Sequence, residues 1–137
     1  VAIIGALAAV GVVAYNGYTA AAKKNSSKSI HANIVKYVAS ELAKCNLDTE
    51  SELFGADTVT CSSNAGAIAT YLVGDDTPIQ DKDPYDGDKA PVGSTPTKPE
   101  GNVVITTDGD DIIFTTQYNK PGTGESAETL TTTVTVE

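Results

Sequence analysis

The sequence predicts an α+β protein in which a long N-terminal helix, the stem (1–44), packs its second half against the small antiparallel β-sheet of a head (45–137). Three observations lead to this fold class. The chain opens with twenty-two uncharged and mostly apolar residues. Apolar residues then recur at intervals of three and four along 30–45, as on one face of a helix. The last third holds short runs of Val, Ile and Thr between turn residues, which is typical of antiparallel strands.

The first half of the stem, 1–22, is suited to contact with lipid or with other helices. A bilayer span needs about 20 mostly apolar residues, and this run is borderline because polar residues dilute its last third. Gly5 and Ala9 have the spacing that lets helix backbones approach closely. We expect this half to contact lipid or other helices, in a processed or incompletely represented chain whose residues upstream of Val1 are missing. The alternative is a buried helix of a soluble core, but no other part of the chain is apolar enough to surround it.

The second half of the stem, 23–44, is predicted to be an amphipathic helix that packs on the head. A continuous helix over 1–44 would be roughly 66 Å long at about 1.5 Å per residue, so half of it must protrude from a small head. The residues expected on the apolar face are Ile30, Ile34, Tyr37 or Val38, Leu42 and Cys45.

The charge divides where the stem ends. The stem carries five Lys and one Glu, whereas the head carries four Lys and seventeen acids, which gives net charges of +4 and −13. No nucleic-acid partner is expected, because phosphate contacts need clustered Lys or Arg. The basic stem could attract the acidic heads of neighbouring copies, or the two surfaces could simply be solvated separately.

The first part of the head is predicted to hold little regular structure. Residues 46–57 are rich in polar and turn residues and should form a loop, which ends in a short extended run at 58–61. Ser63 or Asn64 could cap the segment 65–73, which is helical by composition but could also be a strand.

The strands of the sheet are expected in the last third of the chain. Residues 74–101 contain five of the six prolines and are predicted to be loop. The segments 102–107 and 111–118 should form a hairpin around Gly109, because a Gly between two Asp favours a tight turn. The run 129–136 alternates Thr with apolar residues, as a half-buried antiparallel strand does.

The chain's two cysteines, Cys45 and Cys61, could form a disulfide that supports a small core. The closed loop would contain fifteen residues, which in the chain-entropy model contributes about 3 kcal/mol. Such a bond persists in an oxidising compartment, and the apolar N-terminus also favours export. The alternative is two buried free thiols in a cytosolic protein.

The opening residues VAIIGALAAVGVVAYNGY resemble the N-terminal segment of type IV pilins and of the pseudopilins of type II secretion systems. The resemblance covers about the first twenty residues. Val13 stands where this family usually has Pro, so no proline kink is expected in the helix. The prepilin cleavage site and the glutamate that follows it would lie before Val1. The matching residues are Val1–Gly5, Leu7–Ala9, Ala14, Tyr15 and Tyr18.

The resemblance implies a pilin-like fold and a structural role. The protein would be made as a membrane-anchored precursor and would polymerise through its N-terminal helix into an extracellular type IV pilus-like filament. Its partners would be identical subunits in a helical homopolymer, the inner membrane before assembly and the pilus assembly machinery. The residues assigned to the assembly interface are Val1, Ile3, Ile4, Gly5, Leu7, Ala8, Ala9, Val10, Gly11, Val12, Val13, Tyr15 and Tyr18.

Two other functions remain open from the sequence. One is a pseudopilin of a type II secretion or DNA-uptake system, which shares the assembly chemistry. The other is a membrane-tethered periplasmic module that binds calcium or another ligand.

The residues show no catalytic constellation, and no enzyme activity or organic cofactor is expected. The single histidine, His31, has no acid or nucleophile at helical spacing. Hard oxygen ligands at close spacing are what Ca²⁺ needs, but the EF-hand spacing is absent, so a solvated acidic loop is the alternative. The candidate calcium ligands are Asp81, Asp83, Asp86 and Asp88.

Overall fold

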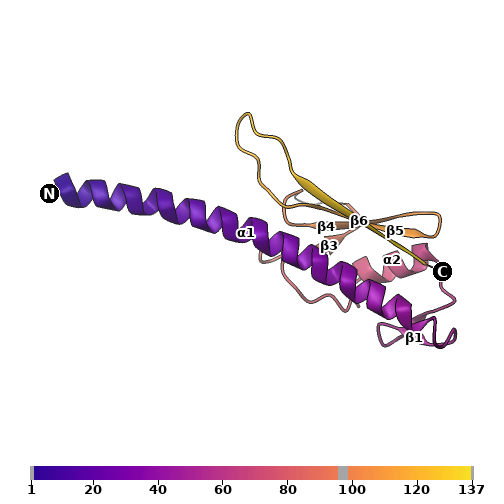
Figure 1. Ribbon diagram of the computed structural model, residues 1–137. Coiled ribbons are helices and arrows are strands. Elements are labelled where there is room, and N and C mark those ends of the chain that lie inside the picture. The colour runs from indigo at the N-terminus through magenta and orange to yellow at the C-terminus, as the bar shows by residue number, and fades with distance from the viewer. Residues whose placement is uncertain (1, 96–98, 137) are drawn as a thin grey trace.

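The computed structural model describes residues 2–95 and 99–136, and for residues 2–7 it describes the backbone alone. It consists of one long helix and a head of two small sheets and a short helix, so the predicted α+β class is confirmed (Figure 1). The elements in chain order are α1 (Ala2–Lys44), β1 (Glu52–Leu53), β2 (Ala56–Thr60), α2 (Ala65–Val73), β3 (Val92–Gly93), β4 (Val103–Asp108), β5 (Asp111–Gln117) and β6 (Thr129–Thr135).

Helix α1 is a single element of 43 residues, whose first half extends away from the head (Figure 1). It contains no proline, and the helix continues through Val13, where a kink was not expected. Its second half packs on the sheet through contacts with β5 and β6. The buried side chains recur at the predicted intervals of three and four; they are Ser27, Ile30, His31, Ile34, Val38 and Glu41.

The main sheet has the strand order β3-β4-β5-β6. Its β4–β5 and β5–β6 pairs are antiparallel, as predicted, but β3 pairs with β4 in parallel. The sheet is therefore mixed and not purely antiparallel. Gly109 begins the two-residue turn of the β4–β5 hairpin with φ of +61°, a backbone conformation that favours glycine.

Two local predictions need correction or refinement. The stretch 46–57 is not all loop, because it contains β1 and the start of β2, which pair as a separate antiparallel hairpin. The ambiguous segment 65–73 is a helix, α2. Asn64 caps this helix: its side-chain Oδ1 accepts a hydrogen bond from the backbone N–H of Ala67 at 2.9 Å.

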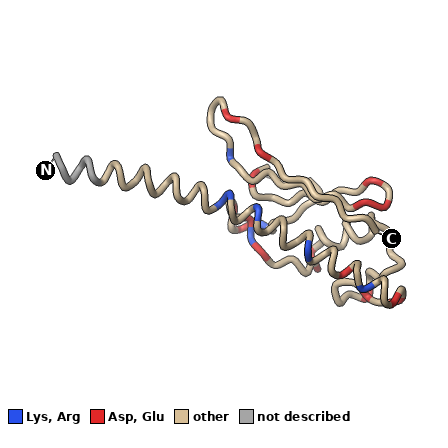
Figure 2. Tube along the Cα trace, viewed as in Figure 1, with Lys and Arg blue, Asp and Glu red and all other residues tan. Residues whose placement is uncertain are grey.

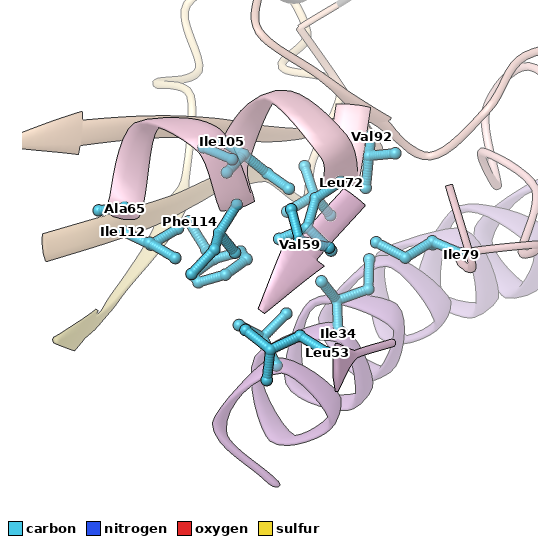
Figure 3. Close-up of a cluster of buried hydrophobic side chains, with 14 of the residues drawn as sticks. Ile34, Leu53, Val59, Ala65, Leu72, Ile79, Val92, Ile105, Ile112 and Phe114 are labelled. Atoms are coloured by element: carbon cyan, nitrogen blue, oxygen red, sulfur yellow. The ribbon is translucent and has the colours of Figure 1, made fainter. Parts of the chain in front are cut away.

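The hydrophobic core lies between the helices and the inner face of the main sheet (Figure 3). Strand β5 alternates between buried and half-buried residues, so Ile112 and Phe114 point into the core and are fully buried. Leu72 from α2 and Ile34 from α1 enter the same core. Burying each such side chain contributes about 1.5–3 kcal/mol, which fixes the second half of α1 to the head.

Candidate assembly interface

The first half of α1 carries large apolar side chains that touch no part of the head. Every side chain from Ala8 to Tyr18 is exposed, on all sides of the helix. The exposed fractions of the large residues are 69% for Val10, 59% for Val12, 73% for Val13, 67% for Tyr15 and 75% for Tyr18. A contiguous apolar surface of this kind marks a site of interaction with protein or lipid.

Small residues on this helix are not required by the fold of the chain. Added Cβ atoms at Gly11 and Gly17 would meet nothing within 4 Å. Ala9 and Ala14 line a shallow apolar hollow between the side chains of Val10 and Val13. Small residues next to larger ones form the surface that allows two helix backbones to approach closely.

The structure places the predicted interface residues as follows. Val1 lies outside the described residues, and Ile3, Ile4, Gly5 and Leu7 are described as helical backbone only. Within the described part of the chain, no helix combines the length and the apolar character that a membrane span requires. The other eight predicted residues are helical and exposed; they are Ala8, Ala9, Val10, Gly11, Val12, Val13, Tyr15 and Tyr18.

Three lysines and two tyrosines form a junction where α1 meets the head. The Nζ atom of Lys28 lies 4.2 Å from the centre of the Tyr118 ring, and that of Lys24 lies 5.2 Å from it. Lys23 lies over Tyr85, with its Nζ 5.6 Å from the ring centre. Such cation–π contacts are weakly stabilising at exposed sites. We call these five residues the lysine–tyrosine junction.

The junction changes the expected electrostatics of the stem. Lys24 also forms a salt bridge with Glu128, which follows the loop between β5 and β6. Basic residues gather on α1 where it reaches the head, and acidic residues lie on the head's loops (Figure 2). The three lysines therefore contact the head of their own chain. They are not simply solvated, and they are not free to pair only with the acidic residues of a neighbouring copy. The sequence signal was the position of the three lysines directly after the apolar run.

His31 is buried between α1 and the sheet, where it joins the helix to two strands. Its Nδ1 lies 2.9 Å from Oγ1 of Thr116 on β5, and its Nε2 lies 2.9 Å from Oγ1 of Thr132 on β6. Only 1% of the residue is exposed, and this burial lowers the pKa of the imidazole below its usual value. His31 therefore acts as a neutral structural connector.

The disulfide between Cys45 and Cys61 is present, with a Cα–Cα distance of 5.4 Å. It joins the end of α1 to the residue after β2. Glu41 strengthens the same corner, because its carboxylate accepts hydrogen bonds from Lys44 at 2.5 Å and from the backbone N–H of Phe54 at 2.8 Å. Burial opposes ionisation of Glu41, but these two hydrogen bonds and the charge of Lys44 together outweigh it and hold the pKa below its usual value.

The four candidate calcium ligands are not brought together around one point. Among residues 2–95 and 99–136, no group of three or more His, Cys, Asp or Glu side chains is arranged to hold a metal ion. Asp81 and Asp88 are exposed and Asp86 is half-buried, whereas Asp83 is buried. Calcium binding by this loop stays a prediction from the sequence.

Asp83 has a structural role in this loop. Its Oδ1 accepts a hydrogen bond from the backbone N–H of Tyr85 at 2.8 Å and lies against Gly101, which has φ of +84°. Burial raises the pKa of the Asp83 carboxyl, and backbone N–H groups only partly offset that effect.

Comparison with family models, with curated proteins and with solved structures finds no match to this chain. The resemblance to pilins therefore rests on the N-terminal residues given above.

Proposed function

We propose that this chain is a pilin-like structural subunit that polymerises through the first half of α1 into an extracellular filament. The observation that carries the proposal is the exposure of this apolar half on all its sides. If the helix were apolar on one side only, it would fit a contact between two chains. Val10, Val12 and Val13 are exposed on different sides of the helix, which fits a bundle of several helices. The head would then lie on the outside of the filament.

The driving force follows from the amount of apolar surface that assembly removes from water. Burial of apolar surface stabilises by about 25 cal/mol per Å², and each buried Val or Tyr contributes through this term. The small residues Ala9, Gly11 and Ala14 allow neighbouring helices to approach, which adds van der Waals contact. A helix with these properties can exchange lipid for copies of itself.

The disulfide supports the proposed location outside the cytoplasm. Disulfides persist in the periplasm and outside the cell, and the bond between Cys45 and Cys61 joins the end of α1 to the end of β2. The proposed partners are identical subunits, with the inner membrane and an assembly machinery acting before polymerisation. A pseudopilin would use the same helix surface, but it would form only a short periplasmic fibre.

The proposal is tested by electron microscopy of the purified full chain as detergent is removed. Wild-type protein is expected to form filaments, and Val13→Asp is expected to stop this because it places a carboxylate in the apolar helix contact. Ser29→Asp is the matched control, since it adds the same charge to an exposed position of α1 beside the head. Circular dichroism checks that both variants remain folded.

The outcomes separate the candidate functions. Long fibres from wild type and Ser29→Asp, but not from Val13→Asp, support the filament. Equal fibre formation by Val13→Asp contradicts the proposed interface. Wild-type protein that stays monomeric on vesicles at all concentrations favours the tethered module instead.

A further inference from the structure

Strand β6 forms a long and uncovered edge of the main sheet. It is the last strand in the order β3-β4-β5-β6 and has seven residues, whereas the opposite edge, β3, has two. An edge strand presents unpaired backbone groups that can pair with another chain. The edge of β6 is independent of the α1 surface to which the proposed function is assigned.

The hydrogen bonds at the two ends of the β5–β6 pair show which groups of β6 are free. The N–H of Val136 donates to the carbonyl of Asp110 at 2.8 Å, and the N–H of Tyr118 donates to the carbonyl of Glu128 at 3.1 Å. Directly bonded pairs recur at every second residue of an antiparallel ladder, so the even-numbered residues of β6 bond to β5.

The odd-numbered residues of β6 therefore direct their backbone N–H and C=O groups away from the sheet. Within the described chain, these groups have no strand or loop as hydrogen-bond partner. Their side chains are all exposed, which leaves the edge accessible. The residues are Thr129, Thr131, Thr133 and Thr135.

The edge also lacks the features that normally prevent strand pairing. Proteins protect edge strands with Lys, Pro, bulges or short length. Residues 129–136 contain no charged residue and no proline, and β6 pairs with β5 through seven consecutive residues without a bulge. An uncharged, bulge-free edge of this length is a template for another strand.

We propose that β6 docks against β6 of a second copy in antiparallel orientation, with Thr131 opposite Thr133 of the other chain. In this register Thr129 lies opposite Thr135, so all four odd-numbered residues pair. The strand is thus complementary to itself, as an interface with two-fold symmetry requires. Cross-strand pairs of threonine are favourable in sheets.

Charge favours contact between two copies through this strand over contact through the rest of the head. The head carries a net charge of −13, so most of its surface repels a second head. Residues 129–136 are an uncharged stretch through which two acidic heads can meet.

The symmetry axis runs perpendicular to the joined sheet, so the two stems point in opposite directions. The contact would therefore join separate filaments sideways and would not extend one filament.

Two charge variants of the full chain test the register. In the proposed dimer, Thr131→Lys with Thr133→Lys places Lys opposite Lys twice, whereas Thr131→Lys with Thr133→Glu places Lys opposite Glu twice. Dissociation constants are measured by analytical ultracentrifugation in dodecyl maltoside micelles, which cover α1. The Lys/Lys variant is expected to weaken dimerisation roughly tenfold or more, and the Lys/Glu variant to preserve it.

Amide hydrogen exchange gives a second and direct readout. On raising the concentration of wild-type protein, the N–H groups of Thr131 and Thr133 should become protected, while that of Val134 is protected throughout. A wild type that stays monomeric, or dimers that both charge variants form equally well, would overturn the edge pairing. The second of these results would place the dimer contact in the stem and leave the filament proposal intact.

Discussion

At the scale of single residues, three buried polar residues have defined partners and structural roles. His31 joins the stem to two strands, Glu41 fixes the turn at Phe54, and Asp83 shapes the loop against Gly101. A buried polar group that loses its partner costs about 1–3 kcal/mol. Two residues of this group give separate predictions.

Gly101→Ala should destabilise the head by about 2–4 kcal/mol. An added Cβ would lie 2.2 Å from Oδ1 of Asp83, and the backbone already has a φ of +84° that disfavours a side chain. Gly109→Ala is the control, because its φ is also positive but its Cβ would meet nothing within 4 Å. That variant should lose only about 1–2 kcal/mol. Equal losses in urea denaturation would show that the Asp83 contact has no effect.

The free energy of unfolding should fall as the pH drops below about 6.5, the usual pKa of histidine. Burial lowers the pKa of His31 in the folded state, so in this range the unfolded chain binds more protons than the folded chain. The contribution is complete above the unfolded pKa and is lost toward the lower folded pKa. Urea titrations of wild type and His31→Gln should diverge there; parallel curves would contradict the prediction.

The comparison with His31→Gln is needed because Asp83 acts in the opposite direction. Its pKa is raised in the folded state, so protonation at acidic pH relieves the cost of burying its charge. The difference between the two curves removes this contribution.

At the scale of elements, the disulfide holds the β1–β2 hairpin to the end of α1. Both strands lie inside the loop between Cys45 and Cys61, and Phe54 of their turn stacks on Tyr71 of α2 with ring centres 5.8 Å apart. The hairpin has only two paired positions of its own. Its order therefore depends on the covalent bond and on contacts with the two helices.

Replacing both cysteines with serine should lower the free energy of unfolding by about 3 kcal/mol. The loss should begin locally, because the hairpin is the smallest unit that the bond constrains. In the double serine variant, the rate of amide hydrogen exchange should increase first in β2, while the amides of β5 stay protected. A loss below about 1 kcal/mol would show that the loop is already constrained in the unfolded chain.

The elements also show what the sequence could predict. Periodicity is a local signal, so α1, the β4–β5 hairpin and β6 were predicted close to their observed bounds. Strand β3 was missed because two residues in a proline-rich loop carry no pattern, and their pairing depends on β4. The roles of His31 and of the lysine–tyrosine junction were missed for the same reason: each depends on residues some 60 to 100 positions away, as with His31 and Thr132.

At the scale of the whole molecule, the exposed apolar surface of α1 is separate from the charged groups. The exposed half of α1 is uncharged through Ala22, and the next lysines contact the head's own tyrosines and Glu128. Within the candidate interface, the sequence could predict the apolar surface but not how completely the fold leaves it exposed.

Filaments should therefore withstand salt. Raising the ionic strength from about 0.05 to about 0.5 M shortens the screening length severalfold, which weakens exposed ion pairs but not apolar contacts. The mass of pelletable filament is expected to stay constant or to rise, because screening also reduces repulsion between acidic heads. Filaments that dissolve at high salt would instead indicate attraction between the stem lysines of one copy and the acids of another.

The position of the disulfide has a mechanical consequence for a subunit held in a fibre by its stem. Tension transmitted along α1 reaches Cys45 directly after the last helical residue, Lys44, and can cross the covalent bond to Cys61. The fifteen residues between them are bypassed, so pulling cannot extend that part of the chain. The load falls instead on the packing of α1 against the sheet. There, the contacts of His31 and of the lysine–tyrosine junction oppose displacement of the helix along its own axis.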